Sequence, residues 1–191
     1  MPLTTYTAGQ VLTAASLNAN LSFASTNGGL VCVKAETAFS AVASVTADNV
    51  FTSAYTNYKI IMNYTTSTTN STNLKLRVGG VSASTNYSLY YAAGTAWASG
   101  TLISQTSFLL GDYSNGSFNC SNVLELQQPA IATATTLWNN ATTSRGAYTS
   151  PYPQYTLGNH STGTAYDGVE LLVATGTMTG TYAIYGYSKT V

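Results

Sequence analysis

The sequence predicts an all-β fold, an antiparallel β-sandwich of the jelly-roll type with about ten strands and one short N-terminal helix. Three observations predict it. Only 6% of the 191 residues are Asp, Glu, Lys or Arg, and Thr, Ser, Asn and Tyr carry most of the polarity. Thr and Tyr favour strands, whereas Asn, Ser and Gly favour turns. From residue 30 onward, apolar residues alternate with polar ones or form short runs between turn-forming clusters.

The residues before this point follow a different pattern and predict one short helix. Thr13 can cap it, and Leu17, Leu21 and Ala24 then fall on one face of the helix. Gly28 can end it. A helix of this length is marginal on its own, so we expect it to dock on its own domain, on a neighbouring subunit or on a larger structure.

The change of pattern divides the chain into two parts. Residues 1–28 are expected to form an N-terminal attachment arm that includes the helix, and residues 29–191 a β-sandwich domain. Hydrophobic residues make up 45% of the chain, which is normal for a globular protein. The low charge therefore does not indicate disorder, which needs low hydrophobicity combined with high net charge.

Two stretches show the clearest strand pattern. Apolar residues alternate in 58–65 and again in 74–78, and we expect these two to pair as a hairpin around a polar loop at 66–73. The stretch 139–163 is expected to be the longest irregular segment, because it contains two prolines and no strand pattern. Further strands are expected at 30–36, 40–46, 86–91, 101–110, 118–127, 134–139, 168–174 and 178–187.

Few residues could support catalysis or hold a metal ion. The single histidine, His160, lies in the turn-like string GNHSTG, where we expect an exposed loop, and no Gly-x-Ser-x-Gly elbow accompanies it. One histidine and two distant cysteines cannot supply a zinc site. The six carboxylates could include the pair that glycoside hydrolysis needs, yet their spacing selects no pair. We predict no enzymatic activity, no cofactor and no metal.

The charge of the chain and its targeting signals limit the possible partners. Six basic and six acidic residues cancel and are scattered singly, which argues against nucleic acid and against electrostatic membrane docking. No secretory signal and no membrane span of about 20 apolar residues is recognisable. We therefore expect synthesis in a cytosol, with Cys32 and Cys120 as buried free thiols rather than a disulfide. A net charge of zero favours a permanent oligomer.

Three stretches resemble a family of virion proteins. The opening TYTAGQVLTAASLNANL is similar to the beginning of many fibre and minor tail proteins of tailed bacteriophages. The middle stretch NVFTSAYTNYKIIMNYTTSTTNSTNLKLRVGG resembles a module that recurs in phage virions, with a Tyr-x-Asn-Tyr, an apolar strand, a polar loop and a Leu-x-Leu-Arg strand. The ending GTMTGTYAIYGYSKT is similar to the closing strand of the same module.

The resemblance implies a structural, non-enzymatic protein of the virion exterior, synthesised in the host cytoplasm and commonly a homotrimer. The leading hypothesis is a subunit of a tail fibre or adhesin that attaches the phage to a glycan or protein on the host surface. A capsid decoration or head-fibre protein without receptor binding is the alternative, and a polysaccharide-degrading tail enzyme is a third hypothesis. The resemblance implies that the virion attachment segment contains Tyr6, Val11, Leu12, Leu17 and Leu21.

Tyrosines are the remaining candidates for a site. The chain has 15 Tyr and 2 Trp, more than one core easily buries, and an exposed tyrosine offers both a ring and a hydroxyl to a sugar or a protein. Tyr148, Tyr152 and Tyr155 in the expected irregular segment, with His160, are the candidates for host-surface contact. Burial in the core or at a subunit interface is the other interpretation of these tyrosines.

Overall fold

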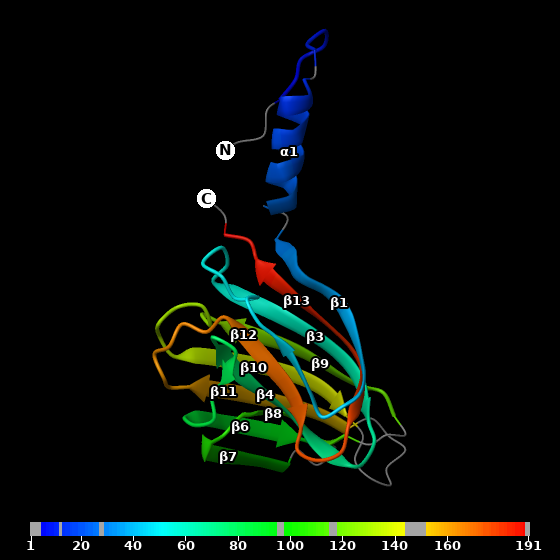
Figure 1. Ribbon diagram of the computed structural model, residues 1–191, viewed down its shortest axis with the longest axis vertical. Coiled ribbons are helices and arrows are strands. Elements are labelled where there is room, and N and C mark those ends of the chain that lie inside the picture. Colours follow the sequence, from blue (N-terminus) through cyan, green and yellow to red (C-terminus); the bar gives the residue numbers. More distant parts are fainter. Residues whose placement is uncertain are drawn as a thin grey trace.

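Two antiparallel sheets pack face to face, and one helix extends beyond them (Figure 1). This confirms the predicted fold class. The computed structural model describes residues 5–11, 13–26, 29–94, 98–114, 118–143 and 152–189.

The larger sheet, sheet A, has eight strands in the order β1-β13-β3-β9-β10-β11-β6-β7. All of its neighbouring strands are antiparallel. In the order of the sheet, the strands are β1 (Leu30–Val42), β13 (Met178–Tyr187), β3 (Asn57–Thr66), β9 (Cys120–Gln127), β10 (Thr135–Thr143), β11 (Tyr152–His160), β6 (Tyr87–Ala93) and β7 (Ala98–Gln105).

The smaller sheet, sheet B, has five strands. Its central strand β4 pairs with β12 on one side, and with β8 and the short β5 on the other. The strands are β2 (Ser44–Ala47), β12 (Gly168–Val173), β4 (Asn70–Val78), β5 (Val81–Ser82) and β8 (Phe108–Ser114).

The expected hairpin between 58–65 and 74–78 is wrong, because β3 and β4 lie in different sheets. β3 pairs with β13 and β9, whereas β4 pairs with β12, β8 and β5. The connection is also shorter than expected and covers only 67–69. Both strands carry large apolar side chains on one face, and crossing to the opposite sheet lets these faces cover each other.

The expectation that residues 139–163 are irregular is also wrong, because most of them belong to a hairpin. β10 and β11 pair in continuous register from Thr135 opposite His160 to Thr143 opposite Tyr152. Residues 144–151 between them lie outside the described residues. The expected strand 101–110 is likewise two strands, β7 and β8, which belong to different sheets.

Polar side chains on the inner face of sheet A explain why this hairpin shows no apolar alternation. Asn122 of β9 and Asn139 of β10 both donate hydrogen bonds to the Leu110 carbonyl of β8, at 3.0 and 2.6 Å. The Asp112 amide donates to Gln154 Oε1 of β11 at 2.7 Å. These amides satisfy backbone groups on the edge of β8 that does not pair with β4, so buried polar residues are needed here.

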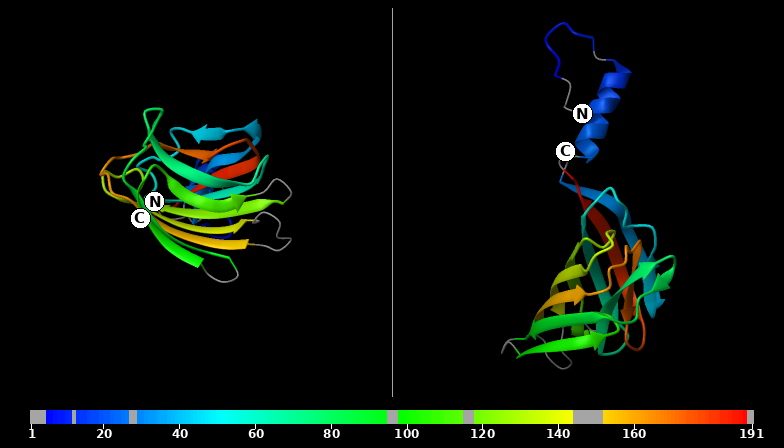
Figure 2. Two further views of the ribbon diagram at one scale, coloured as in Figure 1. Left: turned by 90° about the horizontal axis from the view of Figure 1, so that it is seen from below. Right: turned by 90° about the vertical axis from the view of Figure 1, so that its left-hand side faces the viewer.

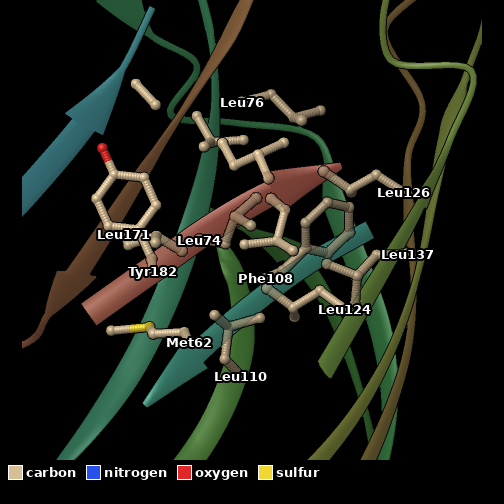
Figure 3. Close-up of a cluster of buried hydrophobic side chains, with 14 of the residues drawn as sticks. Met62, Leu74, Leu76, Phe108, Leu110, Leu124, Leu126, Leu137, Leu171 and Tyr182 are labelled. Atoms are coloured by element: carbon tan, nitrogen blue, oxygen red, sulfur yellow. The ribbon is translucent and has the colours of Figure 1, made fainter. Parts of the chain in front are cut away.

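The core lies between the sheets and contains leucine, isoleucine and aromatic side chains (Figure 3). Tyr58, Ile60 and Met62 of β3 face inward and are 0% exposed. From the other sheet, Leu74 and Leu76 of β4 are equally buried. At about 25 cal/mol per Å² of apolar area, burial of such side chains is the main stabilising term of the sandwich.

The helix α1 (Ala14–Thr26) confirms the predicted cap. The Ser16 amide donates to Thr13 Oγ1 at 3.2 Å, and the Leu17 amide donates to the Thr13 carbonyl at 3.0 Å. The helix extends away from both sheets instead of packing on them (Figures 1 and 2). Within the described ranges α1 is the only helix, and it is not long and apolar enough to cross a membrane.

Neither cysteine forms a disulfide, and only one of the two is buried. Cys120 faces the core at 1% exposure. Cys32 lies on the edge strand β1 and is exposed, so the expectation of two buried thiols is wrong for this residue. Cys32 lies opposite Tyr185 of β13, and its neighbour Val33 packs against the core, so the strand period of two places the Cys32 side chain on the other face of the sheet.

Candidate ligand-binding face

The outward side chains of β3, β9, β10 and β11 form a continuous surface, here called the outer face. Its composition follows from the strand period of two, because the residues between the core positions must face solvent. The strand registers place Trp138 between Glu125 of β9 and Leu157 of β11. They place Asn140 between Val123 of β9 and Tyr155 of β11 in the same way. Directly opposed side chains in such pairs are about 5 Å apart at Cβ.

A depression of about 230 Å³ lies on the outer face. Trp138 is the largest side chain that lines it and is 58% exposed, an unusual exposure for an indole in the middle of a sheet. An indole, a phenol, a carboxylate and an amide therefore converge on one hollow. The residues that line it are Val123, Glu125, Trp138, Asn140 and Tyr155.

The carboxylate of Glu125 is held in place by two neighbours. Lys59 Nζ lies 3.1 Å from Glu125 Oε1, and the Tyr187 hydroxyl donates to Glu125 Oε2 at 2.6 Å. Burial, the hydrogen bond and the negative charge of Glu125 together raise the pKa of Tyr187 to about 12, so the phenol keeps its proton near neutral pH. Glu125 therefore presents a fixed, charge-balanced acceptor beside the indole.

This arrangement suits binding of a ligand that has both an apolar face and hydroxyl groups. The Trp138 ring offers a flat apolar surface, and Glu125 across the strand pair and Asn140 further along β10 offer hydrogen-bond groups beside it. A pyranose ring has the matching properties, with C–H groups on its faces and hydroxyls around its rim. Among the described residues that line the depression, Glu125 is the only carboxylate, so this hollow does not assemble the two-carboxylate pair of a glycosidase.

A metal site is not formed by the described part of the chain. No group of three or more His, Cys, Asp or Glu side chains gathers there closely enough to hold an ion.

The predicted contact tyrosines fall at different places. Tyr155 lies in β11, is 38% exposed and lines the depression. Tyr152 begins the same strand, is half-buried, and its ring covers Gly94, where an added Cβ would lie 2.6 Å from the ring. Tyr148 lies outside the described residues. Of the two tyrosines that the structure describes, one therefore lies in the hollow.

The expectation of an exposed loop histidine is wrong. His160 is the last residue of β11 and is 1% exposed, so it is not available for host-surface contact. Its ring packs against Tyr87 with centroids 4.3 Å apart, and a hydrogen bond of 3.3 Å joins Nδ1 to Tyr166 Oη. Burial lowers the pKa of His160 below its usual range, and hydrogen bonds with backbone groups oppose this only partly.

The buried histidine predicts a pH dependence of stability. Because folding lowers the pKa of His160, the unfolded chain binds the extra proton first, and stability is lost as pH falls below the unfolded value of about 6.5. The slope can reach about 1.4 kcal/mol per pH unit. Urea denaturation of wild type and His160→Gln between about pH 5 and 8 checks this. A slope between about pH 5 and 6.5 that persists unchanged in the variant would contradict the assignment, since the chain has one histidine.

The implied attachment residues are exposed wherever the structure describes them. Val11 is 84% exposed, Leu21 59%, Leu17 41% and Tyr6 37%. Leu12 lies outside the described residues. Within the described residues the helix extends away from the sheets, which does not agree with docking on its own domain, one of the three expected partners (Figure 1).

Sequence reasoning missed the centre of the outer face. The sequence pattern does not indicate Trp138 and Asn140 as site residues, because the strand TTLWNNATT carries polar residues on both faces and shows no apolar alternation. The one available signal was the alternation of Trp138 and Asn140 with Leu137 and Ala141, which places the indole on the face opposite the core.

Comparison with models of known families and with curated proteins finds no match. Among solved structures, the chain is similar to a Caenorhabditis elegans galectin at 9% identity, covering 80% of this chain and 96% of the galectin, with a TM-score of 0.37. It is also similar to infectious bursal disease virus Gx strain at 12% identity, covering 84% of this chain and 40% of the viral chain, with a TM-score of 0.18. Both are remote likenesses.

Proposed function

We propose that this chain is a host-attachment subunit of a phage tail appendage and that it binds a host glycan through the outer face. The observation that carries the glycan part is Trp138, a mid-sheet indole that is 58% exposed above a hollow lined by Glu125, Asn140 and Tyr155. The tail part is supported by the resemblance of the opening, middle and closing stretches to phage virion proteins.

The chemistry of the hollow supports recognition over cleavage. An indole offers a flat apolar contact surface and loses little side-chain entropy on binding, because only two torsions are fixed. Glu125 is already oriented by Lys59 and Tyr187, so binding a sugar hydroxyl requires little further ordering. A single carboxylate among the described lining residues favours binding without hydrolysis.

The surface of the appendage supports an extracellular role. Only 6% of the residues carry charge, so contact with a host surface depends on stacking and hydroxyl recognition and is insensitive to salt. The exposed apolar residues of α1 and of the segment before it lie outside the sandwich, where they can reach another virion protein without covering the outer face (Figures 1 and 2).

Trp138→Ala is expected to weaken glycan binding at least about tenfold, because removing a central aromatic contact typically costs 1.4 kcal/mol or more. The purified chain is first applied to an array of bacterial surface oligosaccharides, and the best binder is then titrated by calorimetry. In a Trp97→Phe background Trp138 is the one remaining indole, so its fluorescence should respond directly to the sugar.

Ile131→Ala is the matched control, because Ile131 is 42% exposed but lies outside the depression. It should bind the sugar as tightly as wild type. Equal affinities for wild type and Trp138→Ala would contradict the site, and a chain that binds no oligosaccharide on the array would contradict the glycan proposal. Release of reducing ends from the bound polysaccharide would favour the enzymatic hypothesis instead.

A further inference from the structure

Most free strand edges of the two sheets are blocked against pairing with another chain, but one edge is open. An unpaired strand edge presents backbone N–H and C=O groups that can pair with another chain, so monomeric proteins block such edges with charges, bulges, short strands or covering side chains. β1 has three register shifts and carries Lys34 and Glu36. β2 has 4 residues and β5 has 2, which is too short to add a strand. The free edge of β8 is covered by Asn122, Asn139 and Gln154.

β7 is the exception among the described edges. It has 8 residues, pairs with β6 on one side, and has no described strand on its other side (Figure 1). Its sequence ASGTLISQ contains no charge and no proline. Ser104 has a φ of 55° and Gln105 Nε2 donates to the Ile103 carbonyl at 2.8 Å, so the far end turns away from regular pairing. The open stretch is therefore 98–102.

We propose that β7 is a self-association edge, where a second copy of this chain pairs its own β7 antiparallel to the first. Antiparallel pairing of a strand with itself is self-complementary, so a two-fold axis satisfies both edges at once. This inference rests on the edge and does not depend on glycan binding.

Electrostatics select a second copy as the occupant. β10, β11, β6 and β7 contain no Asp, Glu, Lys or Arg, and the charged strand residues of sheet A lie on β1, β3 and β9 at the other side of the sheet. A neutral edge meets its own copy without like-charge repulsion, whereas a charged partner would lose hydration without gaining an opposite charge. Exposed apolar side chains beside the edge add contact area, namely Ile103 at 69% and Tyr90 at 46%.

The pairing has a functional consequence if the outer face binds glycan. The two-fold axis of an antiparallel strand pair is perpendicular to the sheet at that pair, so both outer faces begin on the same side of the joined sheet. The sheet twist of about 20° per strand then turns the two sites away from the axis in opposite directions. The two Trp138 side chains would then be about 34 Å apart, seven interstrand spacings of about 4.8 Å each. Where the glycans of one surface can reach both sites together, the linked pair raises avidity about 10²- to 10⁴-fold over a single site.

The test is the mass of the free protein and the position of a cross-link. Wild type should sediment as a dimer of the 20.0 kDa chain at micromolar concentration. Ser99→Lys with Thr101→Lys should give a monomer, because the lysines of the two copies would face each other. The control Ser84→Lys with Ala132→Lys adds the same charge at exposed loop positions and should remain a dimer.

A second measurement locates the edge without adding charge. In a Cys32→Ser background, Ser99→Cys and Thr101→Cys are oxidised separately and as a mixture. Opposed residues in an antiparallel pair have Cα atoms about 4.5–5.5 Å apart, within disulfide range, so at least one of the three samples should form a covalent dimer. A monomeric wild type, an oligomer that the β7 lysines leave intact, or the absence of any cross-link would overturn the proposal. A homotrimer that persists in the lysine variant would place the interface elsewhere, for example on α1.

Discussion

Phe108→Ala is expected to lower the free energy of unfolding by about 3–5 kcal/mol, the usual range for a buried phenylalanine. The ring is 0% exposed and packs edge-on against Tyr87, with centroids 4.8 Å apart. It also lies directly over Gly158 of β11, where an added Cβ would lie 2.5 Å from ring atom Cδ1. Urea or guanidinium denaturation of the purified chain measures the loss.

The contact between Phe108 and Gly158 can also be tested by a substitution at Gly158, which lies in the opposite sheet. Gly158→Ala in wild type is expected to destabilise by about 1–3 kcal/mol, because the methyl group cannot be placed without moving the ring. In the Phe108→Ala background the methyl group enters the vacated space, so its cost should disappear. Gly163→Ala is the control, since its added Cβ would meet nothing closer than 3.5 Å. Additive effects of Phe108→Ala and Gly158→Ala would contradict this packing.

Strand positions were largely predictable, whereas their partners were not. The period of two placed Tyr58, Ile60 and Met62 on one face of a strand, and all three are in the core. The same period says nothing about whether the next strand continues the sheet or crosses the core. At 67–69 the chain crosses to sheet B, where β4 is the central strand. β4 pairs there with β12, which lies nearly 100 residues later in the chain, so the local sequence does not indicate this pairing.

Buried polar residues account for the missed hairpin and for the misplaced histidine. Asn139 looks like a turn residue in the sequence, but it is buried to satisfy the Leu110 carbonyl of β8. His160 lies in a turn-like string, but the aromatic rings of Tyr87 and Tyr166 enclose it. Both placements depend on long-range partners, so local sequence could not predict them. The outer face was missed for the same reason, because its centre, Trp138, lies in this hairpin.

One ionic cluster joins several segments at one end of sheet B. Arg77 of β4 donates to both carboxylate oxygens of Asp48, at 2.7 and 3.3 Å, and to the Gly80 carbonyl at 2.6 Å. It also donates to Ser82 Oγ at 2.8 Å, and that hydroxyl in turn donates to Glu170 at 2.6 Å. The hydrogen bond to Asp48 raises the pKa of Arg77 most, burial opposes it, and the charges of Asp48 and Glu170 add to the increase. One guanidinium therefore holds the turn after β4 against its neighbours, a geometry that the planar five-donor group provides and an ammonium group does not.

Arg77→Met is expected to destabilise the protein by about 2–4 kcal/mol, because its removal leaves the Asp48 carboxylate and the Gly80 carbonyl without their donor. The Arg77 side chain is 12% exposed, whereas Asp48 keeps 35%, which places the expected loss below that of a fully buried pair. Lys59→Met is the matched comparison, since the Lys59 and Glu125 side chains are 26% and 29% exposed and their contact is monodentate. It should cost at most about 1 kcal/mol. Arg77→Lys should recover only part of the loss in denaturant titrations. Equal losses for Arg77→Met and Lys59→Met would show that the bidentate cluster adds nothing beyond an ordinary surface ion pair.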